Sequence, residues 1–140
     1  MLGVAYGLGK KFIGRDLNAV EITESKNMVK YLAELGYGAE VDLAVSDVFD
    51  GKGEYESMFC CPPYSNIEQW NFDENGNCTD MDLPCDEWID VCLQRYKCKR
   101  YLFVVDDKTT VRHRGEVVEL LENKSHFGKN DEYVVVIDGK

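Results

Sequence analysis

Residues 100–107, RYLFVVDD, contain an unbroken apolar run that restricts the fold of this chain more than any other feature. A strand that is apolar on both faces must be covered on both faces. Sheets with such strands are typically parallel, with helices packed on each side. The run therefore predicts an α/β fold with a mostly parallel sheet.

Other predicted strands end at polar or rigid residues. Residues 12–14 form a short apolar strand ending at Asp16, residues 39–47 alternate and end at Asp47, and residues 55–61 run into Pro62. Because proline has no backbone N–H for a ladder, the third strand must stop there. Residues 117–123 and 133–138 indicate a C-terminal antiparallel hairpin, although the first arm also fits helical periodicity.

Two helices are predicted between these strands. The first begins after Asn18, a capping residue, and continues with apolar residues at helical spacing to Gly36. The second covers residues 85–98 and has Trp88 and Cys92 on one side. Residues 65–83 are polar and rich in turn formers, so a loop is expected there.

Length and composition indicate a single domain, residues 1–140, with 44% apolar residues and a net charge of −10. So acidic a chain is expected to contact nucleic acid only through a local basic face or with help from another chain. No apolar run approaches the roughly 18 residues of a membrane span. The N-terminus has no signal layout, and the six cysteines are interpreted as reduced thiols of a cytoplasmic protein.

Polar or special residues at the predicted strand ends indicate a binding site, because ligands of open α/β sheets lie beyond the carboxyl ends of the strands. A carboxylate such as Asp16 can accept hydrogen bonds from both hydroxyls of a ribose. Asp47 can pair with the amino group of an adenine while the apolar Val48 and Phe49 contact its ring. Taken alone, each acid also fits a helix-capping or turn-forming role.

The segments KKFIGRDLN, VSDVF and YESMFCCPPYSNIEQW resemble the class I S-adenosylmethionine-dependent methyltransferases that modify exocyclic amino groups. The closest likeness is to the DNA amino-methyltransferases, whose signature is a strand ending in Asp, Asn or Ser, followed by Pro-Pro and an aromatic residue. The resemblance covers nearly the whole chain. It implies a Rossmann-like methyltransferase sheet, S-adenosylmethionine as cofactor, and the adenine or cytosine of DNA as substrate.

The resemblance also implies roles for individual residues. A base flipped out of the duplex would stack on Tyr64, while the carbonyl of Pro62 and the side chain of Cys61 hold its amino group in line with the sulfonium methyl. The implied cofactor-binding residues are Asp16, Leu17, Asp47, Val48 and Phe49. The implied catalytic residues are Cys61, Pro62, Pro63 and Tyr64.

The sequence departs from the family pattern in two ways. Cys61 replaces the usual Asp, Asn or Ser, and a thiol is a weak hydrogen-bonding group. The segment LGVAYGLGKK resembles the helix that follows the family's glycine-rich loop, so the first strand and that loop are expected to be missing. An N-terminally truncated sheet would have edges that pair with another strand, from a homo-oligomer or a complementing chain.

Other functions remain open. The chain could be a non-catalytic or partner-dependent methyltransferase-fold subunit, or could methylate RNA or a protein glutamine. Zinc is disfavoured because the cysteines form no C-x-x-C pair. Carbon-5 cytosine methylation by Cys85, which follows Pro84, is discounted because that residue precedes a helix rather than ending a strand. A thiol-redox role is also disfavoured, because nothing local would activate a cysteine.

Overall fold

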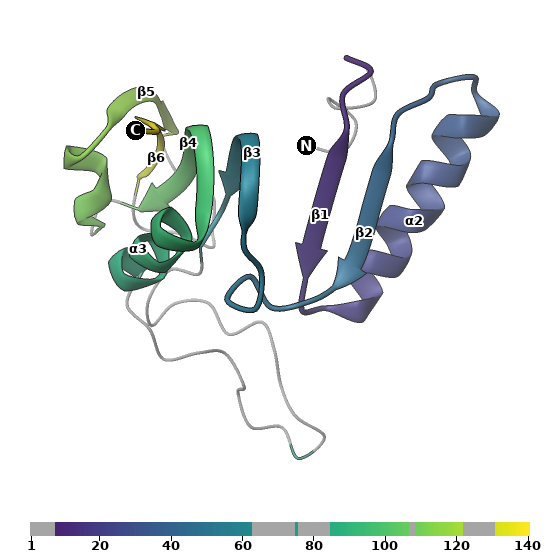
Figure 1. Ribbon diagram of the computed structural model, residues 1–140, viewed down its shortest axis with the longest axis horizontal. Coiled ribbons are helices and arrows are strands. Elements are labelled where there is room, and N and C mark those ends of the chain that lie inside the picture. Colours follow the sequence, from purple (N-terminus) through teal and green to yellow (C-terminus); the bar gives the residue numbers. More distant parts are fainter. Residues whose placement is uncertain (1–7, 63–74, 76–84, 107–108, 122–130) are drawn as a thin grey trace. The chain divides into compact units, whose positions relative to one another are not determined.

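The computed structural model describes residues 8–62, 75, 85–106, 109–121 and 131–140 (Figure 1). Their contacts divide the chain into two compact units, Met1–Gly51 and Lys52–Lys140. Each unit is described by itself below. The prediction of one domain over residues 1–140 stays a prediction, and the expected N-terminal helix end lies largely outside the described residues.

The first unit contains two parallel strands, β1 (Phe12–Asp16) and β2 (Val41–Val45), and the helix α2 (Ala19–Glu34). The side chain of Asn18 accepts a hydrogen bond from the N–H of Val20, which satisfies one of the open donors of the helix start. The helix packs against both strands and buries Ile22. The predicted helix and its capping residue are confirmed.

The first unit buries few side chains. Ile22 is the one buried apolar residue among those described in this unit, at 5% exposure, and α2 exposes Val20, Met28 and Tyr31 on its other side. In the part of the chain that the structure describes, β1 and β2 pair only with each other. Two strands and one helix form a small core, since independent stability usually needs a larger sheet or more extensive packing.

The second unit contains a four-stranded sheet with the strand order β3-β4-β6-β5 (Figure 1). β3 and β4 are parallel, whereas β6 is antiparallel to both β4 and β5. The helix α3 and the short 3-10 helix η1 contact this sheet. The bounds are β3 (Gly53–Cys60), α3 (Cys85–Arg95), β4 (Tyr96–Asp106), η1 (Thr110–His113), β5 (Glu116–Leu121) and β6 (Glu132–Asp138).

The core of the second unit lies around the central strand β4. Phe103 and Val105 of β4 are fully buried, as is Val135 of the neighbouring strand β6. Ile89 of α3 and Val111 of η1 are fully buried as well. The apolar run Tyr101–Val105 therefore lies in β4, one of the two inner strands of this sheet, as its composition indicates.

The expected fold class is wrong: the structure does not contain a mostly parallel, N-terminally truncated Rossmann-like sheet. Two separate sheets are present, and in the larger one only the β3–β4 ladder is parallel. The physical reason is that the apolar run of β4 indicates burial on both faces but not the direction of its neighbours. β6 lies beside β4 in the opposite direction, between β4 and β5.

The predicted second helix and the predicted C-terminal hairpin can both be compared with the structure of the second unit. The second predicted helix ends at Arg95 instead of residue 98, because Tyr96 and Cys98 already belong to the longer strand β4. The hydroxyl of Tyr101 stabilises this start, donating to the Tyr96 carbonyl at 2.5 Å and accepting from the Cys98 N–H at 3.0 Å. The C-terminal segments pair as antiparallel strands, so the helical alternative for the first arm is wrong.

Candidate functional site

Asp16 and Asp47 lie at neighbouring carboxyl ends of the first unit's parallel sheet. Asp16 is the last residue of β1 and is aligned with Val45, the last residue of β2. The carbonyl of Asp16 accepts a hydrogen bond of 3.0 Å from the N–H of Ser46, next to Asp47. The structure therefore brings together the two acids that the sequence predicted at adjacent strand ends.

Each acid is oriented by a hydrogen bond from the backbone. The N–H of Asn18 donates to Oδ1 of Asp16 at 2.7 Å, and the N–H of Phe49 donates to Oδ1 of Asp47 at 2.8 Å. Within the described residues, Oδ2 of neither acid forms a hydrogen bond. The turn-forming role is thus real for both acids, and it orients each carboxylate without using both oxygens.

The side chains beside these acids are mostly accessible. Leu17 is exposed, whereas Val48 and Phe49 are half-buried in the turn after β2. Two half-buried apolar side chains next to an oriented carboxylate suit the edge and face of an aromatic ring.

A groove of about 290 Å³ lies beside Asp16, between β1 and α2. Phe12 and Leu43 provide apolar walls, and Gly14 leaves the space between them, because a Cβ there would meet Leu43 Cδ2 at 2.6 Å and Phe12 Cε1 at 2.9 Å. Sequence reasoning missed Glu21 and Ser25, which also line this groove. Because they are four residues apart, they lie on the same face of α2, and this spacing could have indicated that both line one groove.

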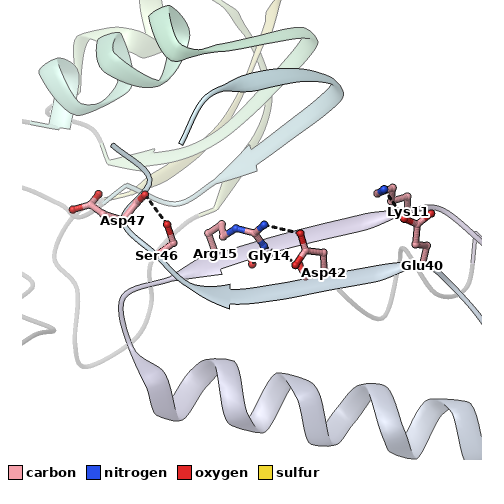
Figure 2. A network of polar contacts seen from close by, with 7 residues as sticks. All are labelled: Lys11, Gly14, Arg15, Glu40, Asp42, Ser46 and Asp47. Carbon is pink, nitrogen blue, oxygen red and sulfur yellow. Dashed lines mark hydrogen bonds and ion pairs between the residues drawn. The ribbon is translucent and has the colours of Figure 1, made fainter. Parts of the chain in front are cut away.

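Two ion pairs tie the strands of the first unit together (Figure 2). Arg15 Nη2 lies 2.7 Å from Asp42 Oδ2, and Lys11 Nζ lies 2.5 Å from Glu40 Oε1. The hydrogen bond from Arg15 lowers the pKa of Asp42, and the hydrogen bond to Glu40 raises the pKa of Lys11. Arg15, which also lines the groove beside Asp16, is therefore held by an ion pair that joins β1 to β2.

The second unit contains the start of the Pro-Pro motif. β3 ends at Cys60, as the prolines predict, and is followed by an exposed Cys61 and a fully buried Pro62. Pro63 and Tyr64 lie outside the described residues. The structure thus places Asp16 with Asp47 in one unit and Cys61 with Pro62 in the other, and it describes the two pairs separately.

Four basic side chains of the second unit form ion pairs with acids. Lys97 and Lys99 form ion pairs with Glu54 and Glu56, at 3.4 and 3.6 Å. In the same way, Arg100 pairs with Asp138 and Arg114 with Asp90. These exposed pairs neutralise charge that would otherwise be available to phosphate.

The described cysteines are free thiols, and several are buried. Burial raises the pKa of Cys85 to about 11 and that of Cys92 to about 12, and it also raises the pKa of Cys60 well above its ordinary value. A nucleophile must form a thiolate, so the buried Cys85 is unsuited to carbon-5 chemistry. Among the described residues, no cluster of His, Cys, Asp or Glu is arranged to hold a metal ion.

These raised pKa values predict an alkaline loss of stability. The unfolded chain releases thiol protons near pH 9, whereas the folded protein retains them up to about pH 11–12. The free energy of unfolding is therefore at its full value below pH 9 and decreases as the pH rises toward 11–12. Each thiol should contribute a slope of about 1.4 kcal/mol per pH unit above pH 9. Urea unfolding under reducing conditions at pH 8.5 and 10.5 measures this fall.

Two matched variants test the assignment. Cys92→Ala should reduce the decrease in unfolding free energy between pH 8.5 and 10.5. Val91→Ala removes a neighbouring apolar side chain and should leave that decrease as in the wild type. An equal fall in all three proteins would contradict the assignment to Cys92.

Comparisons of the chain with protein-family models, with curated proteins and with solved structures give no match. No helix among the described residues has both the length and the apolar character to cross a membrane.

Proposed function

We propose that this chain is an S-adenosylmethionine-dependent methyltransferase that modifies an exocyclic amino group of a DNA base, adenine or cytosine. The observation that carries the proposal is the pair of acids at neighbouring strand ends in the first unit. Asp16 and Asp47 are held in register by the β1–β2 ladder, and each has one oxygen oriented by a backbone N–H. This arrangement suits a nucleoside.

The residues around the acids fit the nucleoside part of S-adenosylmethionine. Asp16, next to Leu17, would accept hydrogen bonds from the ribose hydroxyls, and Asp47 would accept one from the adenine amino group. Val48 and Phe49 would contact the ring. When bound, this cofactor supplies a methyl group already activated on a sulfonium, so the protein mainly has to bind and orient.

The Pro-Pro corner of the second unit supports the choice of an amino group as acceptor. A proline fixes its φ angle and has no N–H, so the Pro62 carbonyl is aimed by the chain itself. Burial of the Pro62 ring adds to that restriction. An aimed carbonyl and the Cys61 side chain would orient the amino group of a flipped base.

Two measurements test the proposal. Calorimetric titration of the full chain with S-adenosylmethionine, with and without duplex DNA, measures cofactor binding. Transfer of a labelled methyl group to unmethylated duplex DNA, followed by mass spectrometry of the nucleosides, identifies N6-methyladenine or N4-methylcytosine. Parallel reactions with RNA and with protein test the alternative substrates. Absence of cofactor binding under both conditions would sink the proposal.

Tyr64→Ala should abolish methylation yet leave cofactor binding largely intact, because the ring is assigned to the target base. Stacking contributes about 1–3 kcal/mol per base. The control is Tyr64→Phe, which keeps the ring and should retain most of the activity. Equal loss of cofactor binding and methylation in Tyr64→Ala would show that Tyr64 is structural.

A partner-dependent or non-catalytic subunit is the second candidate, and the small core of the first unit favours it. Ile22 is the one buried apolar side chain among the residues described there. Among the same residues, β1 pairs with β2 on one side and with no strand on its other side. A complementing chain or a second copy that adds a strand would supply the missing burial. Light scattering at micromolar concentration tests the homo-oligomer.

A further inference from the structure

One face of the four-stranded sheet is covered by a helix. Phe103 and Val105 of β4 and Val135 of β6 are fully buried on this face, because aligned residues and residues two apart on a strand point the same way. Cys60 of β3 is aligned with Phe103, and burial together with the neighbouring Cys92 of α3 raises the pKa of Cys60 well above its ordinary value. α3 therefore lies over this face of the sheet.

The opposite face of the same strands is apolar and only partly covered. Its side chains alternate with the fully buried ones, and those of β4 and β6 are half-buried. Phe59, on the edge strand β3, is 41% exposed. These aligned side chains form the open face, which consists of Phe59, Leu102, Val104, Val134 and Val136.

The open face lacks the cover that such strands need. A strand that is apolar on both faces belongs between two layers, and β4 is apolar on both. The N–H of Val111 in η1 donates to the Asp86 carboxylate of α3 at 3.0 Å, and Val111 is fully buried, so η1 continues the layer that α3 forms. Among the described residues of the second unit, the open face has no such layer.

Two acids border the open face on the side of β5. Glu116 is aligned with Val136 and Glu119 with Val134, so each acid ends a row of apolar side chains. Both acids are exposed, and neither forms an ion pair within the described residues. This border of the open face is therefore negative, and it attracts a partner with positive charges.

The spacing of the two acids matches that of side chains on a helix. The residues aligned with them, Val134 and Val136, are two positions apart on β6, which corresponds to about 7 Å along the strand. The irregularity of β5 after Val117 accommodates its additional residue. Residues four positions apart on a helix are about 6 Å apart along its axis. Two basic residues at that spacing can reach Glu116 and Glu119 together.

We propose that the open face binds an amphipathic helix of another protein chain, whose apolar side lies on the sheet and whose two basic residues, four positions apart, pair with Glu116 and Glu119. Apolar burial supplies the affinity, and the acids select the partner and set its direction. Arg100, on the same face, does not oppose a basic partner, because it pairs with Asp138 at 3.1 Å. The inference uses the second unit alone and does not depend on methyl transfer.

Two designed helical peptides of equal length test the inference. Both carry leucines at helical spacing along one side. Beside the leucines, one peptide has two lysines four positions apart, and the other has two glutamates at the same positions. Titration of each fluorescently labelled peptide with the full chain, followed by anisotropy, measures the affinity. We expect the wild-type chain to bind the lysine peptide at least about tenfold more tightly than the glutamate peptide, because two attractions replace two repulsions.

Charge reversal separates the border acids from the net charge of the chain. Glu116→Lys/Glu119→Lys should bind the glutamate peptide more tightly than the lysine peptide. Glu24→Lys/Glu34→Lys is the matched control, because these acids are exposed on α2 and the net charge changes equally, and it should keep the wild-type preference. A wild-type chain that binds neither peptide, or both equally, overturns the inference. A preference for lysine that survives charge reversal at Glu116 and Glu119 overturns it as well.

Phe59→Ser tests the apolar part of the open face. The ring is 41% exposed at the sheet edge, so its loss should preserve the fold and weaken binding of the lysine peptide about tenfold. Leu35→Ser, at a position of 56% exposure in the first unit, is the control and should keep the wild-type affinity. Equal loss in both variants would indicate non-specific apolar attachment and contradict the inference. Light scattering without peptide tests a second copy as occupant: a dimer that Phe59→Ser dissociates would assign the open face to that copy instead.

Discussion

Asp16→Asn is expected to weaken S-adenosylmethionine binding by about 100-fold, because a charged acceptor of two ribose hydroxyls contributes about 1.5–3 kcal/mol per hydrogen bond. Asparagine still accepts the hydrogen bond from the N–H of Asn18, which is 2.7 Å long in the wild type. The local turn and the start of α2 are therefore preserved. Calorimetric titration measures the affinity, and circular dichroism checks the fold.

Two further variants define the result. Asp47→Asn should also lose affinity, because that acid is assigned to the adenine amino group. Asp50→Asn is the matched control: this residue is exposed in the same turn as Asp47, and its replacement should leave the affinity unchanged. Equal affinity in Asp16→Asn and the wild type would assign Asp16 to the helix start alone.

Gly115→Ala should destabilise the second unit by about 2–4 kcal/mol, which lowers its melting temperature by about 10–20 °C. A Cβ at residue 115 would collide with the carbonyl oxygen of Val136 and would lie 2.8 Å from Cγ1 of Ile137. The first of these atoms belongs to the backbone of β6, so it cannot move away without disturbing the sheet. Thermal unfolding followed by circular dichroism measures the shift.

Gly38→Ala is the control for this substitution. A Cβ at residue 38 would meet open space, and the change should alter stability by less than about 0.5 kcal/mol. A Gly115→Ala protein that melts with the wild type would contradict the close approach of β6 to the segment before β5.

The ends of helices and strands could be predicted where the chemistry of a single residue fixes them. Asn18 has a side chain that caps a helix, and Pro62 has no donor for a ladder, so the start of α2 and the end of β3 were both correct. The boundary between α3 and β4 was placed too late. Residues 96–98 extend because they pair with Gly53–Tyr55 of β3, and the hydroxyl of Tyr101 adds two hydrogen bonds to this segment.

The residues of the candidate site also fall into those that the sequence predicted and those that it did not. Asp16 and Asp47 were recognised because each ends an apolar or alternating run, and the parallel ladder does bring them side by side. Glu21 and Ser25 were missed, because their sequence neighbours do not show that they line a groove. Whether Asp16, Asp47, Cys61 and Tyr64 act on one substrate stays a prediction.

The sequence by itself predicted the start of α2 after Asn18 and the stop of β3 before Pro62, because these properties follow from the chemistry of a capping side chain and of a residue without an N–H. It also placed a continuous apolar run in a strand, of which Tyr101, Phe103 and Val105 are buried. Only the tertiary structure decided strand direction and pairing. A buried strand accepts parallel and antiparallel neighbours alike, and β4 has one of each, β3 and β6. The tertiary structure also places Asp106 as a buried acid at the end of β4, where it accepts a hydrogen bond from Thr109.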